Sequence, residues 1–91
     1  MNGLLAGLGM LGAAIAAGDT IPVSANTLIQ QVYDTLEQMD DHLQFGERKT
    51  YRKALEYAEQ NYMKARQLGA RVDSLERALR VARKVYEMTE W

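Results

Sequence analysis

The chain has 91 residues and no cysteine, and its formal net charge at pH 7 is −1. A chain of this length forms at most one small domain, because it buries only about 60 to 65% of the surface that its unfolded form exposes. The lack of cysteine excludes a disulfide framework and a thiolate metal site. A charged fraction of 25% with a single proline is not the composition of a disordered tail.

The charges are divided unevenly between the two halves of the chain. Residues 1–47 carry six acidic side chains and no lysine or arginine, which gives −6. Residues 48–91 carry eleven basic and six acidic side chains, which gives +5. Each half is therefore suited to attract the other, within one chain or between neighbouring chains.

Residues 1–18 contain no charged side chain and five glycines. As an α-helix this segment would be about 27 Å long, slightly short of the roughly 20 apolar residues of a membrane span. Each glycine costs about 1 kcal/mol of helix stability relative to alanine, so we expect a helix that needs a partner surface. Small residues recur four apart, a spacing that lets helix backbones approach closely; they include Gly3, Gly7, Gly9, Ala13 and Ala17. A separate stripe comprises Leu4, Leu8, Leu11 and Ile15.

Four interpretations of residues 1–18 fit this pattern. We favour close packing against copies of the same chain or against other subunits of an assembly. The alternatives are a transmembrane anchor, a membrane-inserting peptide that a protein complex holds until it is needed, and a secretory signal peptide. The small residues at positions 14 and 16 suit signal cleavage, but no lysine or arginine precedes the apolar run.

Residues 19–23 form a connector, and a helix is expected over residues 24–45. Ser24 is a suitable N-cap, and Val23 is spaced to pack on Leu28 as a hydrophobic staple. Apolar residues then step by three and four, as in a helix that packs in a bundle; this seam comprises Ile29, Val32, Leu36, Met39 and Leu43. Gly46 is expected at C′, just beyond the helix.

A second helical stretch covers residues 47–90, and the short connection at Gly46 predicts that it runs antiparallel to the first. Its apolar pattern shifts phase near Gly69, which indicates either a break over residues 69–73 or one continuous, bent helix; we favour the continuous helix. Beyond the shift, two apolar stripes run side by side. They comprise Leu75, Leu79, Ala82 and Tyr86, and next to them Ala78, Val81, Val85 and Met88. A helix with so wide an apolar surface usually contacts two partners.

No group of residues has the pattern of a catalytic or metal site. Asp40, Asp41 and His42 are consecutive, and consecutive side chains of a helix point in different directions. The chain has one histidine, and no nucleophile–base pair can be assembled around it. The early glycines precede no lysine, so they do not form a phosphate-binding loop. We therefore expect no enzyme activity, no cofactor and no small-molecule substrate.

Two sets of charged residues share one spacing. The acidic set comprises Asp34, Glu37 and Asp41, and the basic set comprises Arg77, Arg80 and Lys84. Because both sets lie away from the apolar seams, we expect them to pair between subunits more readily than inside one hairpin. The alternative use of the basic set is nucleic-acid binding, which would weaken steeply with salt.

The sequence thus predicts an all-α protein, a helical hairpin or small helical bundle with coiled-coil-like seams and an apolar Gly/Ala-rich N-terminal helix. In general character it resembles small subunits of virus particles and secretion apparatus, and also membrane-active viral peptides. We expect a non-enzymatic, homo-oligomeric structural subunit of a multi-copy assembly, either a virus particle (as a phage tail, portal or ejection component) or a secretion apparatus. The first alternative is a membrane-associated protein whose N-terminus anchors or inserts while its charged hairpin recruits a partner. The second is a basic helical module that binds nucleic acid.

Overall fold

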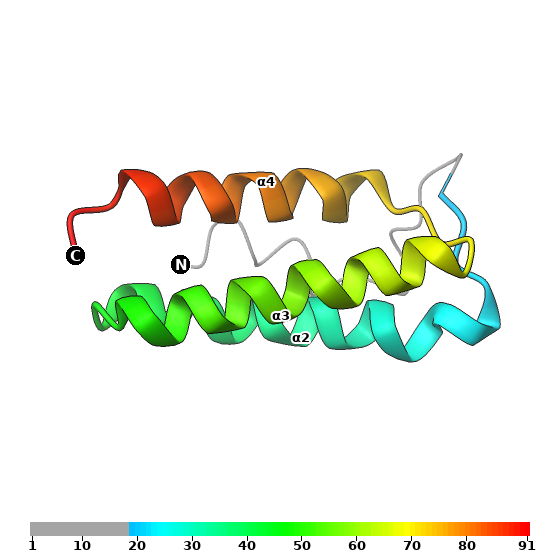
Figure 1. Ribbon diagram of the computed structural model, residues 1–91, viewed down its shortest axis with the longest axis horizontal. Helices are drawn as coiled ribbons and strands as arrows, with labels where there is room; N and C mark the ends of the chain where they lie inside the picture. Colours follow the sequence, from blue (N-terminus) through cyan, green and yellow to red (C-terminus); the bar gives the residue numbers. More distant parts are fainter. Residues whose placement is uncertain (1–18) are drawn as a thin grey trace.

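The computed structural model describes residues 19–91, which form an up-and-down bundle of three α-helices (Figure 1). α2 spans Asn26–Gln44, α3 spans Arg48–Gln67, α4 spans Asp73–Met88, and a short 3₁₀ helix, η2, spans Val23–Ala25. The expected all-α hairpin or small bundle is confirmed. The helix expected over residues 1–18, with its two stripes of small and large residues, lies outside the described residues.

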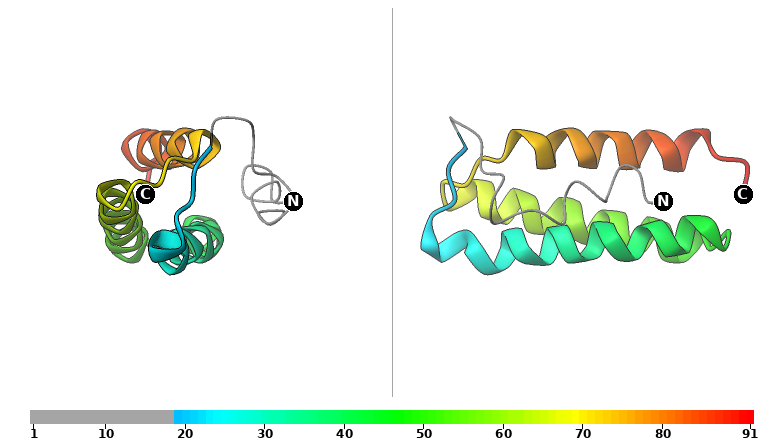
Figure 2. Two further views of the ribbon diagram at one scale, coloured as in Figure 1. Left: turned by 90° about the vertical axis from the view of Figure 1, so that its right-hand side faces the viewer. Right: turned by 180° about the vertical axis from the view of Figure 1, so that it is seen from behind.

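The helix α3 lies beside both of the others, and its neighbours run antiparallel to it (Figure 1). Viewed end-on in Figure 2, α2 and α4 bound the side of the bundle that faces away from α3. The core takes side chains from all three helices, and burial of each large apolar one stabilises the fold by about 1.5 to 3 kcal/mol. The largest fully buried side chains are Ile29, Val32, Leu36, Met39, Leu55 and Leu75.

The remaining residues of the two seams lie at the edge of this core. Leu79 and Ala82 are buried, whereas Leu43 and Tyr86 are partly buried and pack against the buried cluster. The apolar seams of α2 and α4 therefore face inward, and most of the exposed side chains of both helices are polar or charged; on α4, Val81 and Met88 are exposed as well.

The helix α2 ends at a glycine in the left-handed region. Gly46 has a φ of 69°, its N–H donates to the Leu43 carbonyl at 3.2 Å, and the Glu47 N–H donates to the His42 carbonyl at 2.8 Å. This is a Schellman motif, in which residues beyond the helix satisfy carbonyls that the last turn leaves unpaired. The expectation that Gly46 occupies C′ is confirmed.

The continuous helix that we favoured through Gly69 is wrong, because α3 ends before this residue and α4 begins after it. Gly69 has a φ of 101°. Its N–H donates to the Arg66 carbonyl and the Ala70 N–H donates to the Ala65 carbonyl, both at 2.9 Å. A second Schellman motif therefore ends α3, and the chain turns back to form a third helix instead of extending the second.

The Tyr62 hydroxyl fastens the start of α4 to α3. It accepts the Val72 N–H at 3.1 Å and donates to Glu76 Oε2 at 2.7 Å, and Arg66 donates to the same carboxylate oxygen at 2.8 Å. Burial raises the pKa of Tyr62 to about 12. The hydrogen bond from Tyr62, followed by the charge of Arg66, lowers the pKa of Glu76.

Residues 19–22 cross from the start of α4 to the start of α2. Thr20 and Arg71 exchange two backbone hydrogen bonds, with N···O distances of 2.8 and 2.7 Å. Asp19 Oδ1 accepts the Asp73 N–H at 3.2 Å, which places a negative charge at the positive end of the α4 dipole. The first described residue is thus fixed at the N-terminal end of α4.

The helix α2 begins two residues later than the sequence predicts. Ser24 lies within η2 and caps no helix through its side chain. The Ala25 N–H donates to the Pro22 carbonyl at 2.9 Å, and this tight turn buries Ala25 while leaving Val23 94% exposed. The predicted staple between Val23 and Leu28 is therefore wrong.

Candidate interaction surface

An exposed apolar strip runs along the C-terminal half of α4. It consists of Val81, which is 43% exposed, Val85, which is partly buried, and Met88, which is 74% exposed. We call these three residues the α4 strip. With Arg80, Lys84 and Thr89 they line a shallow hollow of about 590 Å³.

The α4 strip combines an apolar floor with a cationic border. The two exposed basic side chains, Arg80 and Lys84, present aliphatic stems beside the strip and charged groups at its rim. A contiguous apolar patch with a polar rim is typical of a contact between proteins. This surface is suited to an apolar helix or loop.

The strip continues onto the side of the bundle between α2 and α4. A smaller hollow of about 40 Å³ lies there, lined from α2 by Leu36, Met39, Asp40 and Leu43, from α3 by Tyr51, and from α4 by Ala82 and Val85. Val85 lines both hollows. The apolar surface of α4 therefore reaches the partly buried edge of α2 without a charged residue of α4 in between.

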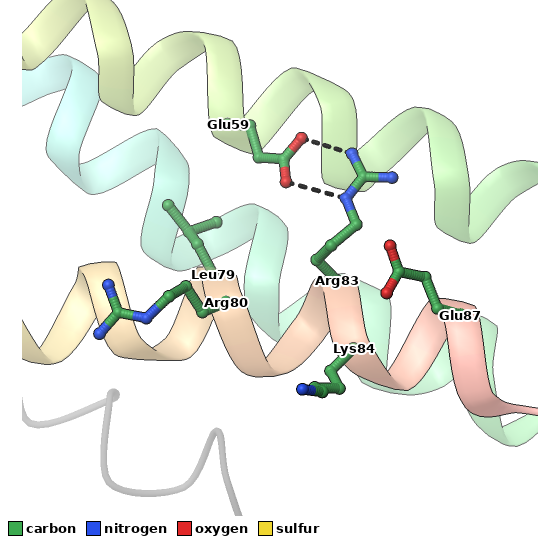
Figure 3. Close-up of a pocket in the computed structure, with 6 residues that line it drawn as sticks. All are labelled: Glu59, Leu79, Arg80, Arg83, Lys84 and Glu87. Atoms are coloured by element: carbon green, nitrogen blue, oxygen red, sulfur yellow. Dashed lines mark hydrogen bonds and ion pairs between the residues drawn. The ribbon is translucent and has the colours of Figure 1, made fainter.

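The opposite side of α4 is fastened to α3 by an ion pair. Arg83 Nη2 donates to Glu59 Oε1 at 2.6 Å, and Arg83 Nε donates to Glu59 Oε2 at 3.2 Å. Figure 3 shows Arg83 turned toward Glu59, while Arg80 and Lys84 extend away from this pair. The hydrogen bonds to Glu59 raise the pKa of Arg83. Arg83 is thus paired within the fold, in contrast to the exposed Arg80 and Lys84.

Three aromatic rings gather where the start of α3 meets the end of α4. Tyr51 and Tyr86 stack with centroids 6.1 Å apart, and Trp91 lies 5.3 and 5.9 Å from them. Trp91 Nε1 donates to the Tyr86 carbonyl at 3.0 Å, and the Tyr51 hydroxyl donates to the Ala82 carbonyl at 2.7 Å. Burial raises the pKa of Tyr51 to about 12. The apolar pattern alone did not indicate this cluster, although the antiparallel course of the two helices brings both tyrosines to one end.

The two predicted charge sets occupy separate, solvent-facing surfaces. The residues of the acidic set, Asp34, Glu37 and Asp41, are exposed on α2, and those of the basic set, Arg77, Arg80 and Lys84, are exposed on α4. Among residues 19–91, no ion pair joins the two sets. Their pairing between subunits stays a prediction.

The described part of the chain holds no group of three or more His, Cys, Asp or Glu side chains placed to bind a metal ion. His42 Nδ1 lies 2.8 Å from Glu47 Oε1. Within residues 19–91, no helix combines the length and apolar character of a membrane span.

The chain matches no protein-family model, no curated protein and no solved structure.

Proposed function

We propose that the chain is a non-enzymatic structural subunit of a multi-copy assembly, such as a virus particle or a secretion apparatus, in which residues 1–18 pack between subunits. The observation behind this proposal is the α4 strip, in which the exposed Val81 and Met88 and the partly buried Val85 lie side by side on one helix. The chain also carries an uncharged segment of 18 residues. Exposure of either apolar element to water is unfavourable, and contacts between proteins would remove this cost by burying them.

The pattern of residues 1–18 supports burial against protein. With 100° between successive residues of a helix, the small residues Gly9, Ala13 and Ala17 would lie roughly opposite the stripe that contains Leu8 and Leu11. A lipid tail gains nothing from small residues, whereas a second helix gains close backbone contact. One face of such a helix would therefore suit a bulky apolar surface, and the other would suit a neighbouring subunit.

The charge distribution supports repeated contacts between copies of the chain. Each copy presents exposed acids on α2 and exposed bases on α4, so two identical chains can meet with opposite charges in register. Exposed pairs of this kind contribute only about 0 to 1 kcal/mol each. They would select the orientation of the subunits, while apolar burial would supply most of the affinity.

The experiment is size-exclusion chromatography with light scattering on the full chain in detergent-free buffer, with two variants at one position. The unchanged chain is expected to form a defined oligomer. Gly9→Leu is expected to lower its molar mass to that of a monomer or dimer, because the added side chain blocks close backbone approach. Gly9→Ala, the matched control, keeps a small residue and should keep the oligomer.

Other outcomes would favour the two alternatives. A full chain that is soluble only with detergent or liposomes, and that tolerates Gly9→Leu, would favour a membrane-associated protein. Retention of nucleic acid that falls steeply with salt would favour a nucleic-acid-binding module. The first result would contradict an assembly held together through residues 1–18.

A further inference from the structure

The chain enters the described bundle at a fixed point. Asp19 accepts a hydrogen bond from the first residue of α4, Asp73, and the next residue, Thr20, forms a two-bond bridge with Arg71. Residue 18 is covalently attached to this anchored end. The apolar segment is therefore tethered at the N-terminal end of α4 without a spacer.

The lengths of the segment and of α4 agree. The 16 residues of α4 extend about 24 Å, and 18 helical residues extend about 27 Å. A helix that runs back from Asp19 along α4 would reach Met88 at the far end. The α4 strip lies along this path, because Val85 of the strip also lines the hollow between α2 and α4.

The topology also suits this course. Residues 1–18 would end where α2 and α4 begin, so the segment would run antiparallel to both of them. Antiparallel neighbours joined by short connections are the arrangement of up-and-down four-helix bundles. With residues 1–18 as a fourth helix beside α2 and α4, the chain would form such a bundle.

We infer that, in the isolated subunit, residues 1–18 occupy this position on their own chain, with the stripe of larger residues seated on the α4 strip. Equal helical rise from the Asp19–Asp73 contact would place Leu8 level with Lys84, between Val81 and Val85, and Leu4 level with Met88. The small-residue stripe would then face outward and stay available to other subunits. This inference goes beyond the proposed function, since it concerns the chain before assembly.

Cysteine cross-linking of the full chain tests the inference, because the natural sequence has no cysteine. One double variant combines Leu8→Cys with Val85→Cys. A second combines Leu4→Cys with Met88→Cys, at a position of α4 that is 74% exposed and so tolerates replacement. The matched control combines Leu8→Cys with Gln60→Cys, on the exposed outer face of α3. A short bis-maleimide reagent joins the pairs. Mass spectrometry of the intact products distinguishes a chain bridged by one reagent molecule from a chain that carries two singly attached ones, and it also detects cross-linked dimers.

We expect both test pairs to form a cross-link within one chain. A tethered partner has an effective concentration of about 1 mM, so at about 10 μM protein the cross-link within one chain should exceed that between chains roughly a hundredfold. The control pair should give little product. Circular dichroism before cross-linking confirms that each variant keeps its helices.

Two outcomes would overturn the inference. Equal yields from the test and control pairs would show that the segment is not on the α4 strip. The second outcome comes from a mixture of the Leu8→Cys and Val85→Cys single variants. If this mixture gives cross-linked dimers in the same yield as the cross-link of the double variant, the strip receives the segment of a second copy. Neither result alone contradicts the proposed assembly, which the Gly9 variants test separately.

Discussion

Removal of the Tyr62 hydroxyl tests the account of the α3–α4 connection most sharply. In Tyr62→Phe the N–H of Val72, a residue that is 2% exposed, loses its 3.1 Å acceptor, and Glu76 loses its 2.7 Å donor. A buried N–H without a partner costs about 1 to 3 kcal/mol. For a domain of this size, 2 kcal/mol corresponds to a fall in Tm of roughly 8 to 16 °C.

The measurement is thermal unfolding followed by circular dichroism at neutral pH. Tyr57→Phe is the matched control, because Tyr57 is half-exposed on the same helix and loss of a solvated hydroxyl should change stability by less than about 0.5 kcal/mol. If the two variants unfold at the same temperature, the hydroxyl of Tyr62 does not hold the start of α4, and the reasoning is refuted.

The pH dependence of the same variant gives an independent readout. Folding lowers the pKa of Glu76 from its ordinary value of 4.5, chiefly through Tyr62. A lowered pKa contributes stability that is present above pH 4.5 and is lost as the pH falls through the folded-state value. The difference in the free energy of unfolding between wild type and Tyr62→Phe should therefore narrow as the pH falls from about 6 to about 3. A constant gap would contradict the link between the two groups.

Two further predictions concern the turns and the ion pair. Gly69→Ala should cost about 1 to 2 kcal/mol, and more than Gly46→Ala. The φ of 101° at Gly69 lies further from the left-handed helical region than the φ of 69° at Gly46, and an added Cβ at Gly69 would make only ordinary van der Waals contact with Pro22 Cγ, at 3.4 Å. Urea denaturation measures both costs, and equal costs would contradict a larger backbone strain at Gly69. Glu59→Gln should cost less than about 1 kcal/mol in low salt, because its pair with Arg83 is about one-third exposed. Its cost should shrink in 1 M NaCl, and a salt-independent loss would contradict an electrostatic origin.

Local pattern was sufficient to predict the helical class and the end of α2. The seam of Ile29, Val32, Leu36 and Met39 has the period of a packed helix, and all four side chains are buried. Gly46 follows the last turn, where only the adjacent residues decide the conformation. These features depend on residues close in sequence, so the sequence alone could indicate them.

The break at Gly69 depends on contacts between residues far apart in sequence. The segment around it contains a single poor helix former, so helix propensity alone permits a continuous helix. The break is held by the Tyr62 hydroxyl on Val72 and by the bridge between Thr20 and Arg71. Neither contact can be read from periodicity. The same limit applies to the pair of Glu59 with Arg83, 24 residues apart.

The interaction surface could be predicted in part. The second stripe of α4 was visible in the spacing of Ala78, Val81, Val85 and Met88. Its division into a buried end and an exposed end was not visible, because the position of α2 decides which residues are covered. Ala78 is buried, whereas Val81 and Met88 are exposed.

The central claim is that residues 1–18 are buried against protein. Flotation of the full chain with liposomes in a density gradient, without detergent, tests it most directly. The account predicts that the chain stays soluble and remains in the dense fractions as an oligomer, because its apolar segment is already covered. A chain that floats with the liposomes and loses this property in a Leu8→Asp variant would contradict the account, since lipid would then be the surface that buries the segment.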